Sequence, residues 1–211
     1  MATVLNPPEQ RIMLRNVSWE TYELLLADHT DSSSPRFTYD KGALEIMSPS
    51  PEHERVNRSI SMFVEVLAEV TNLDWDNLGS TTFKREDLER GFEPDSCFYI
   101  QNAEFIKGKT KIDLHTDPPP DLIIEIDITS ESLNKLPIYA QLRIPEVWRY
   151  DGKRLIILRL EGNEFIECER SFAFPFLADS VISTFIENSK SLKRAEWLRS
   201  IREWAQLNKQ A

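Results

Sequence analysis

Polar and apolar residues recur with helical spacing most clearly between residues 50 and 71. Ser50 is a favoured N-cap, Pro51 suits the first helical position, and acidic residues fill the first turn. A single apolar stripe then runs along the predicted helix, formed by Val56, Ile60, Phe63, Val64, Leu67 and Val70. The same spacing predicts a short helix over 18–27 and further helices over 182–188 and 190–208.

Most of the remaining pattern is typical of short strands. Two alternating runs, 36–39 and 43–47, flank Asp40-Lys41-Gly42 and predict a β-hairpin. Further strand-like runs cover 80–84, 96–100, 122–128, 146–150, 155–160 and 164–169. A brief helix that begins near Asn134, with Pro137 in its first turn, separates the third and fourth of these runs. Residues 1–17 are expected to form an extended arm, and the chain as a whole is mixed α/β (α+β).

The composition indicates one acidic folded domain. The 211 residues include 25 Lys or Arg and 35 Asp or Glu, which gives a formal net charge of −10, and 41% are hydrophobic. That length and apolar content suit one domain, placed at 1–188, followed by a C-terminal helix at 189–211. The acidic balance argues against a general nucleic-acid coat protein, because binding to phosphates relies on a basic surface.

The C-terminal segment differs in charge from the rest of the chain. It holds six basic and two acidic residues. A basic amphipathic helix could bind nucleic acid, or dock on the acidic body of its own or a partner subunit. Trp197 and Trp204 are seven residues apart and fall on nearly one helix face, so docking or dimerisation is favoured.

Two cysteines, Cys97 and Cys168, are too few for a disulfide scaffold or a four-thiolate zinc site. No apolar run approaches the roughly 20 residues that a membrane span needs. The first residues also lack the basic and apolar regions of a signal peptide. The expectation is therefore a cytoplasmic protein with no membrane partner.

Three carboxylates occur where a core strand should be apolar. Alternation in the run 122–128 places Glu125 and Asp127 on one face, and Asp95 follows Pro94 at the start of another strand. Buried carboxylates on one face repel each other and usually persist beside cations or a metal. Lys135 lies ten residues after Glu125. The residues therefore permit a Mg²⁺-assisted hydrolase of phosphoesters. On spacing alone, the favoured interpretation is that Glu125 and Asp127 form salt bridges at a strand end and that Asp95 closes a turn.

Several blocks of the chain, in this order, resemble the Uma family of restriction-endonuclease-like proteins. They are Gly42–Ser50 (GALEIMSPS), His53, Glu93-Pro94-Asp95, 118–130 (PPPDLIIEIDITS), 135–139 (KLPIY) and 144–150 (IPEVWRY). The resemblance covers roughly residues 18–178. It implies the PD-(D/E)XK nuclease superfamily, with a restriction-endonuclease-like core in which helices flank a mixed central β-sheet, and Mg²⁺ as cofactor with Mn²⁺ as a substitute.

The resemblance carries the acidic positions onto Asp95 and Glu125. The superfamily lysine usually lies two residues after the second acid, where this chain has Asp127. The resemblance therefore suggests that Lys135, on the following helix, takes the lysine role. Asp127 is then either an additional metal ligand or a partner of Lys135.

Other residues are secondary candidates for the site. Glu45 either reaches the metal or faces solvent from its strand, and the two readings are equally favoured. His53 could contact phosphate or act in acid–base chemistry, but a partly exposed helix residue is the favoured interpretation. Tyr139 is expected to pack in the core.

The leading hypothesis is a Mg²⁺-dependent endodeoxyribonuclease with Asp95, Glu125 and Lys135 as catalytic residues and Asp127 as a further metal ligand. Binding to DNA should be weak and salt-sensitive for so acidic a chain, and a homodimer is expected by analogy with restriction enzymes. The alternative is a non-catalytic protein with a nuclease fold, acting as a regulatory or oligomerising binding module. A metal hydrolase of another substrate is a third option.

Overall fold

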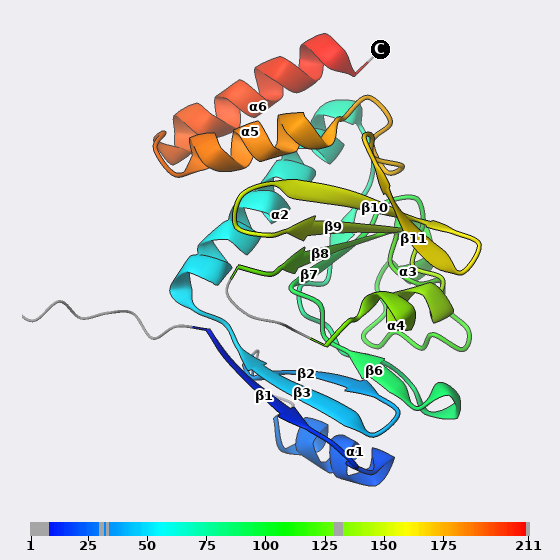
Figure 1. The fold of residues 1–211 in the computed structure, drawn as a ribbon. Coiled ribbons are helices and arrows are strands. Elements are labelled where there is room, and N and C mark those ends of the chain that lie inside the picture. The colour runs from blue at the N-terminus through cyan, green and yellow to red at the C-terminus, as the bar shows by residue number, and fades with distance from the viewer. Residues whose placement is uncertain (1–8, 30–31, 33, 129–132, 210–211) are drawn as a thin grey trace, which may run out of the picture.

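The computed structural model describes residues 9–29, 32, 34–128 and 133–209, which form two β-sheets and the helices that cover them (Figure 1). The larger sheet has the strand order β11-β10-β9-β8-β7-β4. Its strands are β4 (Asp76–Asn77), β7 (Ser96–Tyr99), β8 (Leu122–Ile126), β9 (Glu146–Tyr150), β10 (Leu155–Glu161) and β11 (Glu164–Cys168). Strands β8 and β9 are parallel and the other pairs are antiparallel, so the sheet is mixed, as expected for the fold class.

The smaller sheet is antiparallel and has the order β1-β3-β2-β6-β5. Its strands are β1 (Gln10–Leu14), β2 (Arg36–Asp40), β3 (Ala43–Ser48), β5 (Phe83–Arg85) and β6 (Arg90–Phe92). Helix α1 (Trp19–Asp28) packs on it through Tyr22. A Cβ on Gly91 would lie 2.2 Å from the Tyr22 hydroxyl, so only glycine allows this approach.

Helices cover both faces of the larger sheet (Figure 1). One face packs against α2 (Pro51–Thr71), α5 (Asp179–Ser189) and α6 (Arg194–Asn208). The other face packs against the short helices α3 (Ala103–Ile106) and α4 (Leu136–Gln141), and a 3₁₀ turn spans Glu86–Leu88. Because β8 is covered on both sides, its alternating residues enter two separate apolar cores.

The long helix α2 forms as its sequence signals predict. Ser50 accepts a hydrogen bond from the backbone N–H of His53 at 3.2 Å, Pro51 begins the helix, and Asn72 ends it in the left-handed conformation. The buried stripe of this helix faces the larger sheet. The predicted hairpin is likewise confirmed by the pairing of β2 with β3.

Other boundaries differ from the sequence prediction. The expected arm contains strand β1, which pairs with β3, while residues 1–8 lie outside the described part. The predicted strand over 80–84 begins only at Phe83, and strand β6 was not predicted. Strand β8 ends at Ile126, and Thr129 and Ser130 of the resemblance block lie outside the described residues.

Helix α6 lies along α2 and α5 (Figure 1). Trp197, Ile201 and Ala205 are buried in the same core as the apolar stripe of α2. The Nη1 of Arg194 donates to Ser59 at 3.2 Å, and Arg202 forms an ion pair with Glu69 at 3.1 Å. Within the described ranges, no helix combines the length and the apolar character needed to cross a bilayer.

Candidate functional site

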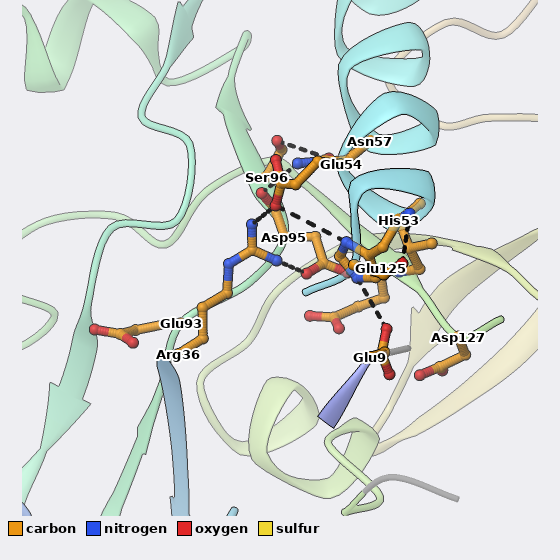
Figure 2. A network of polar contacts seen from close by, with 12 residues as sticks. Glu9, Arg36, His53, Glu54, Asn57, Glu93, Asp95, Ser96, Glu125 and Asp127 are labelled. Atoms are coloured by element: carbon orange, nitrogen blue, oxygen red, sulfur yellow. Dashed lines mark hydrogen bonds and ion pairs between the residues drawn. The ribbon is translucent and has the colours of Figure 1, made fainter. Parts of the chain in front are cut away.

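Two buried acidic side chains lie side by side where β7 and β8 run antiparallel. Ser96 pairs with Ile124, so Asp95, just before β7, comes next to Glu125 on β8. Only 2% of Asp95 and 5% of Glu125 is exposed. Figure 2 shows both carboxylates below the first turns of α2. The register of two strands therefore brings the first two predicted site residues together.

Asp95 is held by donors on several sides. Arg36 donates to Oδ1, and the backbone N–H of Ile126 donates to Oδ2 at 2.7 Å. Burial alone would raise the pKa of Asp95, but contact with His53 and the charges of Arg36 and Lys135 outweigh it and lower that pKa to about 2. Asp95 is therefore ionised throughout the physiological range.

Two side chains associated with α4 donate hydrogen bonds to Glu125, and one of them, Lys135, also neutralises its charge. The Lys135 ammonium lies 2.7 Å from Oε2, and the Tyr139 hydroxyl donates to Oε1. Burial raises the pKa of Glu125 to about 7, because the attraction of Lys135 is countered by the negative charges of Asp95 and Asp127. Burial alone would lower the pKa of Lys135, but Glu125 and Asp95 raise it, so the ammonium stays charged. The predicted reach of Lys135 to the strand is confirmed, and Tyr139 is both buried and part of the site.

His53 belongs to this cluster and is fully buried, so its interpretation as a partly exposed residue is wrong. Its Nε2 lies 3.2 Å from Oδ2 of Asp95, within ion-pair distance but at an angle unsuited to a hydrogen bond. His53 belongs to the first turn of α2, and Figure 2 shows this side chain pointing from the helix toward Asp95. Asn57, one turn later, donates to the backbone carbonyl of Asp95 at 2.9 Å.

The smaller sheet contributes to a second cluster of charged side chains, which is centred on Arg11. Arg11 of β1 lies 2.6 Å from Glu9, 3.1 Å from Glu45 and 3.4 Å from Asp127. Glu45 is 2% exposed and also accepts from the backbone N–H of Leu133 at 2.8 Å, so its solvent-facing reading is wrong. Glu45 and Asp127 thus share a cation that comes from the N-terminal strand.

Mg²⁺, which the resemblance implies, can be tested against these donors. Among the described side chains, no three His, Cys, Asp or Glu residues are arranged to hold a metal, so Asp95, Glu125 and Asp127 do not form a ready three-ligand cage. Mg²⁺ is commonly bound through only one or two carboxylates plus water and substrate. Oε2 of Glu9 is buried with no hydrogen-bond partner in the described part of the chain, 3.8 Å from Nε2 of His53. The carboxylates of Asp95 and Glu125 are hard oxygen donors, which suit a divalent cation, and the unsatisfied Oε2 of Glu9 leaves a spare acceptor beside His53.

A cavity of about 270 Å³ opens beside this pair. Glu125, Asp127, Lys135 and Tyr139 line it on the side of β8 and α4, and Arg149 lines it from β9. Charged and hydrogen-bonding groups therefore face one space that is large enough for a phosphate group.

A family model described as Uma2, "Putative restriction endonuclease", matches residues 19–180. The chain belongs to the Uma2 family. The matched range agrees with the span of the resemblance seen in the sequence, and it contains Asp95, Glu125 and Lys135. No curated protein matches the chain. Membership supports a nuclease-like function.

The sequence did not reveal several polar residues of this Uma2 site. Arg36 begins a strand and Arg11 lies in the unassigned arm, so no local pattern marked either one as a partner of an acid. The only signal was indirect. A buried carboxylate such as Asp95 requires a cation, and the usual lysine of the motif is replaced here by Asp127, so the cation had to come from elsewhere in the chain. Glu9, outside the matched range, carried no signal at all.

Proposed function

We propose that this protein is a Mg²⁺-dependent endonuclease that hydrolyses phosphodiester bonds in DNA. One observation carries the proposal. Asp95 and Glu125 lie together on neighbouring strands, and the buried Lys135 ammonium is 2.7 Å from Glu125, beside an open cavity. Family membership supports the nuclease class.

In this proposal, Asp95 and Glu125 hold the metal. Asp127 lines the same cavity as Glu125 but lies 3.4 Å from Arg11, and it would join only after a rearrangement of its side chain. The ion would supply a Lewis acid that withdraws charge from phosphate oxygens and makes water more acidic. Mn²⁺ would take the same place. Asp95 is suited to this role because its carboxylate is ionised and its orientation is fixed by Arg36 and the N–H of Ile126.

Lys135 and Tyr139 would act on the substrate side. The ammonium of Lys135 has three donors, and only one is needed for Glu125. A remaining donor can orient the attacking water or neutralise charge that develops on the phosphate. Tyr139 fixes the other oxygen of Glu125, so the carboxylate keeps one orientation.

The experiment compares nicking of supercoiled plasmid by the wild type, Asp95→Asn and Glu125→Gln in Mg²⁺ and in Mn²⁺. Both variants should lose at least about 100-fold in rate, because each lacks a ligand charge that the transition state needs. The matched control is Glu65→Gln on α2, where the carboxylate accepts from Asn77 at 2.9 Å, outside the site. Full cleavage by both site variants at wild-type stability would overturn the proposal.

One observation favours the alternative, a non-catalytic protein with a nuclease fold. Arginines already pair with two of the acids, Arg36 with Asp95 and Arg11 with Asp127. Calorimetric titration with Mn²⁺ separates the two candidates. No heat of binding at millimolar Mn²⁺, together with no cleavage by the wild type, would support the regulatory or oligomerising module.

A further inference from the structure

Arg149 lines the cavity, and its charged side chain does not help to hold the described fold together. Its position on β9 pairs with Glu125 on the parallel strand β8, so the two side chains leave the same face of the sheet. Glu125 is nevertheless bound by Lys135 and Tyr139 instead. The Arg149 side chain makes no hydrogen bond or ion pair with any residue that the structure describes, and it lines the cavity half-buried.

The acids near Arg149 are already neutralised by other groups. Lys135 neutralises Glu125, and Arg11 lies 3.4 Å from Asp127. A half-buried guanidinium without a partner keeps five donors in a planar fork, and that fork matches the oxygens of a phosphate in a bidentate contact. The cavity of about 270 Å³ leaves room for such an anion between Arg149 and Lys135.

We propose that Arg149 binds a phosphate group of the nucleic-acid backbone inside this cavity, next to the phosphate that is cut. This inference rests on the proposed function and adds a substrate-binding residue to it. It also explains how a chain with a net charge of −10 could bind DNA, since a half-buried arginine inside the cavity would contact the phosphate in place of a basic surface. A free phosphate ion has the same chemistry, so the test separates the two sources.

The test measures binding of a labelled DNA duplex by fluorescence anisotropy in Ca²⁺, across a series of salt concentrations. Arg149→Gln should bind at least about tenfold more weakly than the wild type, because a charge-assisted bidentate contact is lost. The plot of log affinity against log salt should flatten by about one unit for the missing phosphate contact. Arg149→Lys should recover part of the affinity.

The matched control is Arg159→Gln. Arg159 lies on the neighbouring strand β10, opposite Glu146 in the strand register and so at the other end of β9 from Arg149. Its side chain forms an ion pair with Glu161 at 2.5 Å. This variant should keep the affinity and the salt slope of the wild type. Equal loss in both variants would overturn the inference, since it would report a general effect of removing positive charge.

Two further outcomes are decisive. If the wild type binds and cuts DNA and Arg149→Gln does so equally well, the inference fails while the proposed function stands. If the wild type neither binds nor cuts DNA, both fail. Titration with inorganic phosphate identifies the source of the anion. If Arg149→Gln weakens the binding of phosphate but leaves the binding of DNA unchanged, the cavity is a site for free phosphate. That result would overturn the assignment to nucleic acid.

Discussion

Asp95 and Glu125 are equally hidden from solvent, yet their pKa values move in opposite directions. Contact with His53 and the positive charges of Arg36 and Lys135 outweigh the burial of Asp95, and its pKa falls to about 2. Glu125 has one cation and two nearby acids, and its pKa rises to about 7. Burial raises both pKa values, and the partners of Asp95 outweigh it whereas those of Glu125 do not. Two neighbouring carboxylates whose pKa values are shifted in opposite directions are typical of functional sites.

The low pKa of Asp95 predicts how stability depends on pH. The unfolded carboxyl takes up a proton near pH 3.9, but the folded one does so only near pH 2. The carboxylate therefore stabilises the fold fully above about pH 4, by about 2 kcal/mol, and this contribution is lost as pH falls through 2. Asp95→Asn should remove it, so the wild-type advantage in urea unfolding should be larger at pH 7 than at pH 3.

Glu65→Gln serves as the control in that comparison, because Glu65 pairs only with a neutral Asn77 in the described part of the chain. Its difference from the wild type is measured over the same pH range and subtracted from that of Asp95→Asn. If the remaining difference is the same at pH 7 and pH 3, the assignment of an ionised, stabilised carboxylate at position 95 is contradicted.

At this scale, sequence could predict the acids but not their partners. Carboxylates inside an apolar strand are visible as a break in the pattern. Lys135 follows that strand closely enough in the sequence for its side chain to reach Glu125. Arg36 and Arg11 come from the other sheet, and their side chains meet the acids only after both sheets are packed. The burial of His53 likewise follows from the packing of the first turn of α2 beside Asp95, which helical spacing does not encode.

Strand β1 lies outside the range matched by the family model, yet it contributes side-chain contacts to the site. It is the edge strand of the smaller sheet, and its Arg11 reaches Glu45 on β3 and Asp127 beyond β8. One side chain thereby links the two sheets. Strand β1 is a structural part of the site even though residues 1–17 were expected to be a simple arm.

Removing this cation should be costly. Arg11→Met leaves the buried carboxylates of Glu9 and Glu45 without their partner, and we expect a loss of about 3–5 kcal/mol in the free energy of unfolding. Glu45→Gln should cost less in the Arg11→Met background than in the wild type, because it removes an uncompensated charge there. Urea unfolding of the four proteins measures this coupling.

Arg154→Met is the control for that cycle. Arg154 pairs with Glu167 at 3.1 Å, but both side chains are about half exposed, so the loss should stay below about 1 kcal/mol. Equal midpoints for Arg11→Met and the wild type would contradict a linking role for Arg11.

Elements were predicted best where local signals agree. In α2 the cap, the proline and the apolar stripe all mark one helix, and its start was placed correctly. Strand β6 was missed because it has only three residues, and β1 because its five residues do not alternate between apolar and polar; both depend on partners distant in sequence. Gly91 in β6 even argues locally against a strand, and only the close approach of Tyr22 explains it.

For the whole molecule, α6 completes the core between α2 and α5. Trp197 is 1% exposed, and its indole N–H donates to the Phe185 carbonyl at 2.8 Å. Trp197→Ala should lower the free energy of unfolding by about 3–5 kcal/mol through lost burial and an unpaired carbonyl. Leu207→Ala, at a position 85% exposed, should change it by less than about 0.5 kcal/mol. Equal effects of the two changes in urea unfolding would contradict this role of the helix.

The place of α6 in the chain has a consequence for synthesis of the protein. The apolar stripe of α2 is complete by residue 70, but Trp197, Ile201 and Ala205, which bury it, follow more than a hundred residues later. At about 5–20 residues per second, a ribosome needs roughly 6–30 s to make the intervening chain. During that time part of the α2 surface is open to other apolar chains. Cells that make this protein rapidly should therefore rely on chaperones that bind nascent chains to keep it from aggregating.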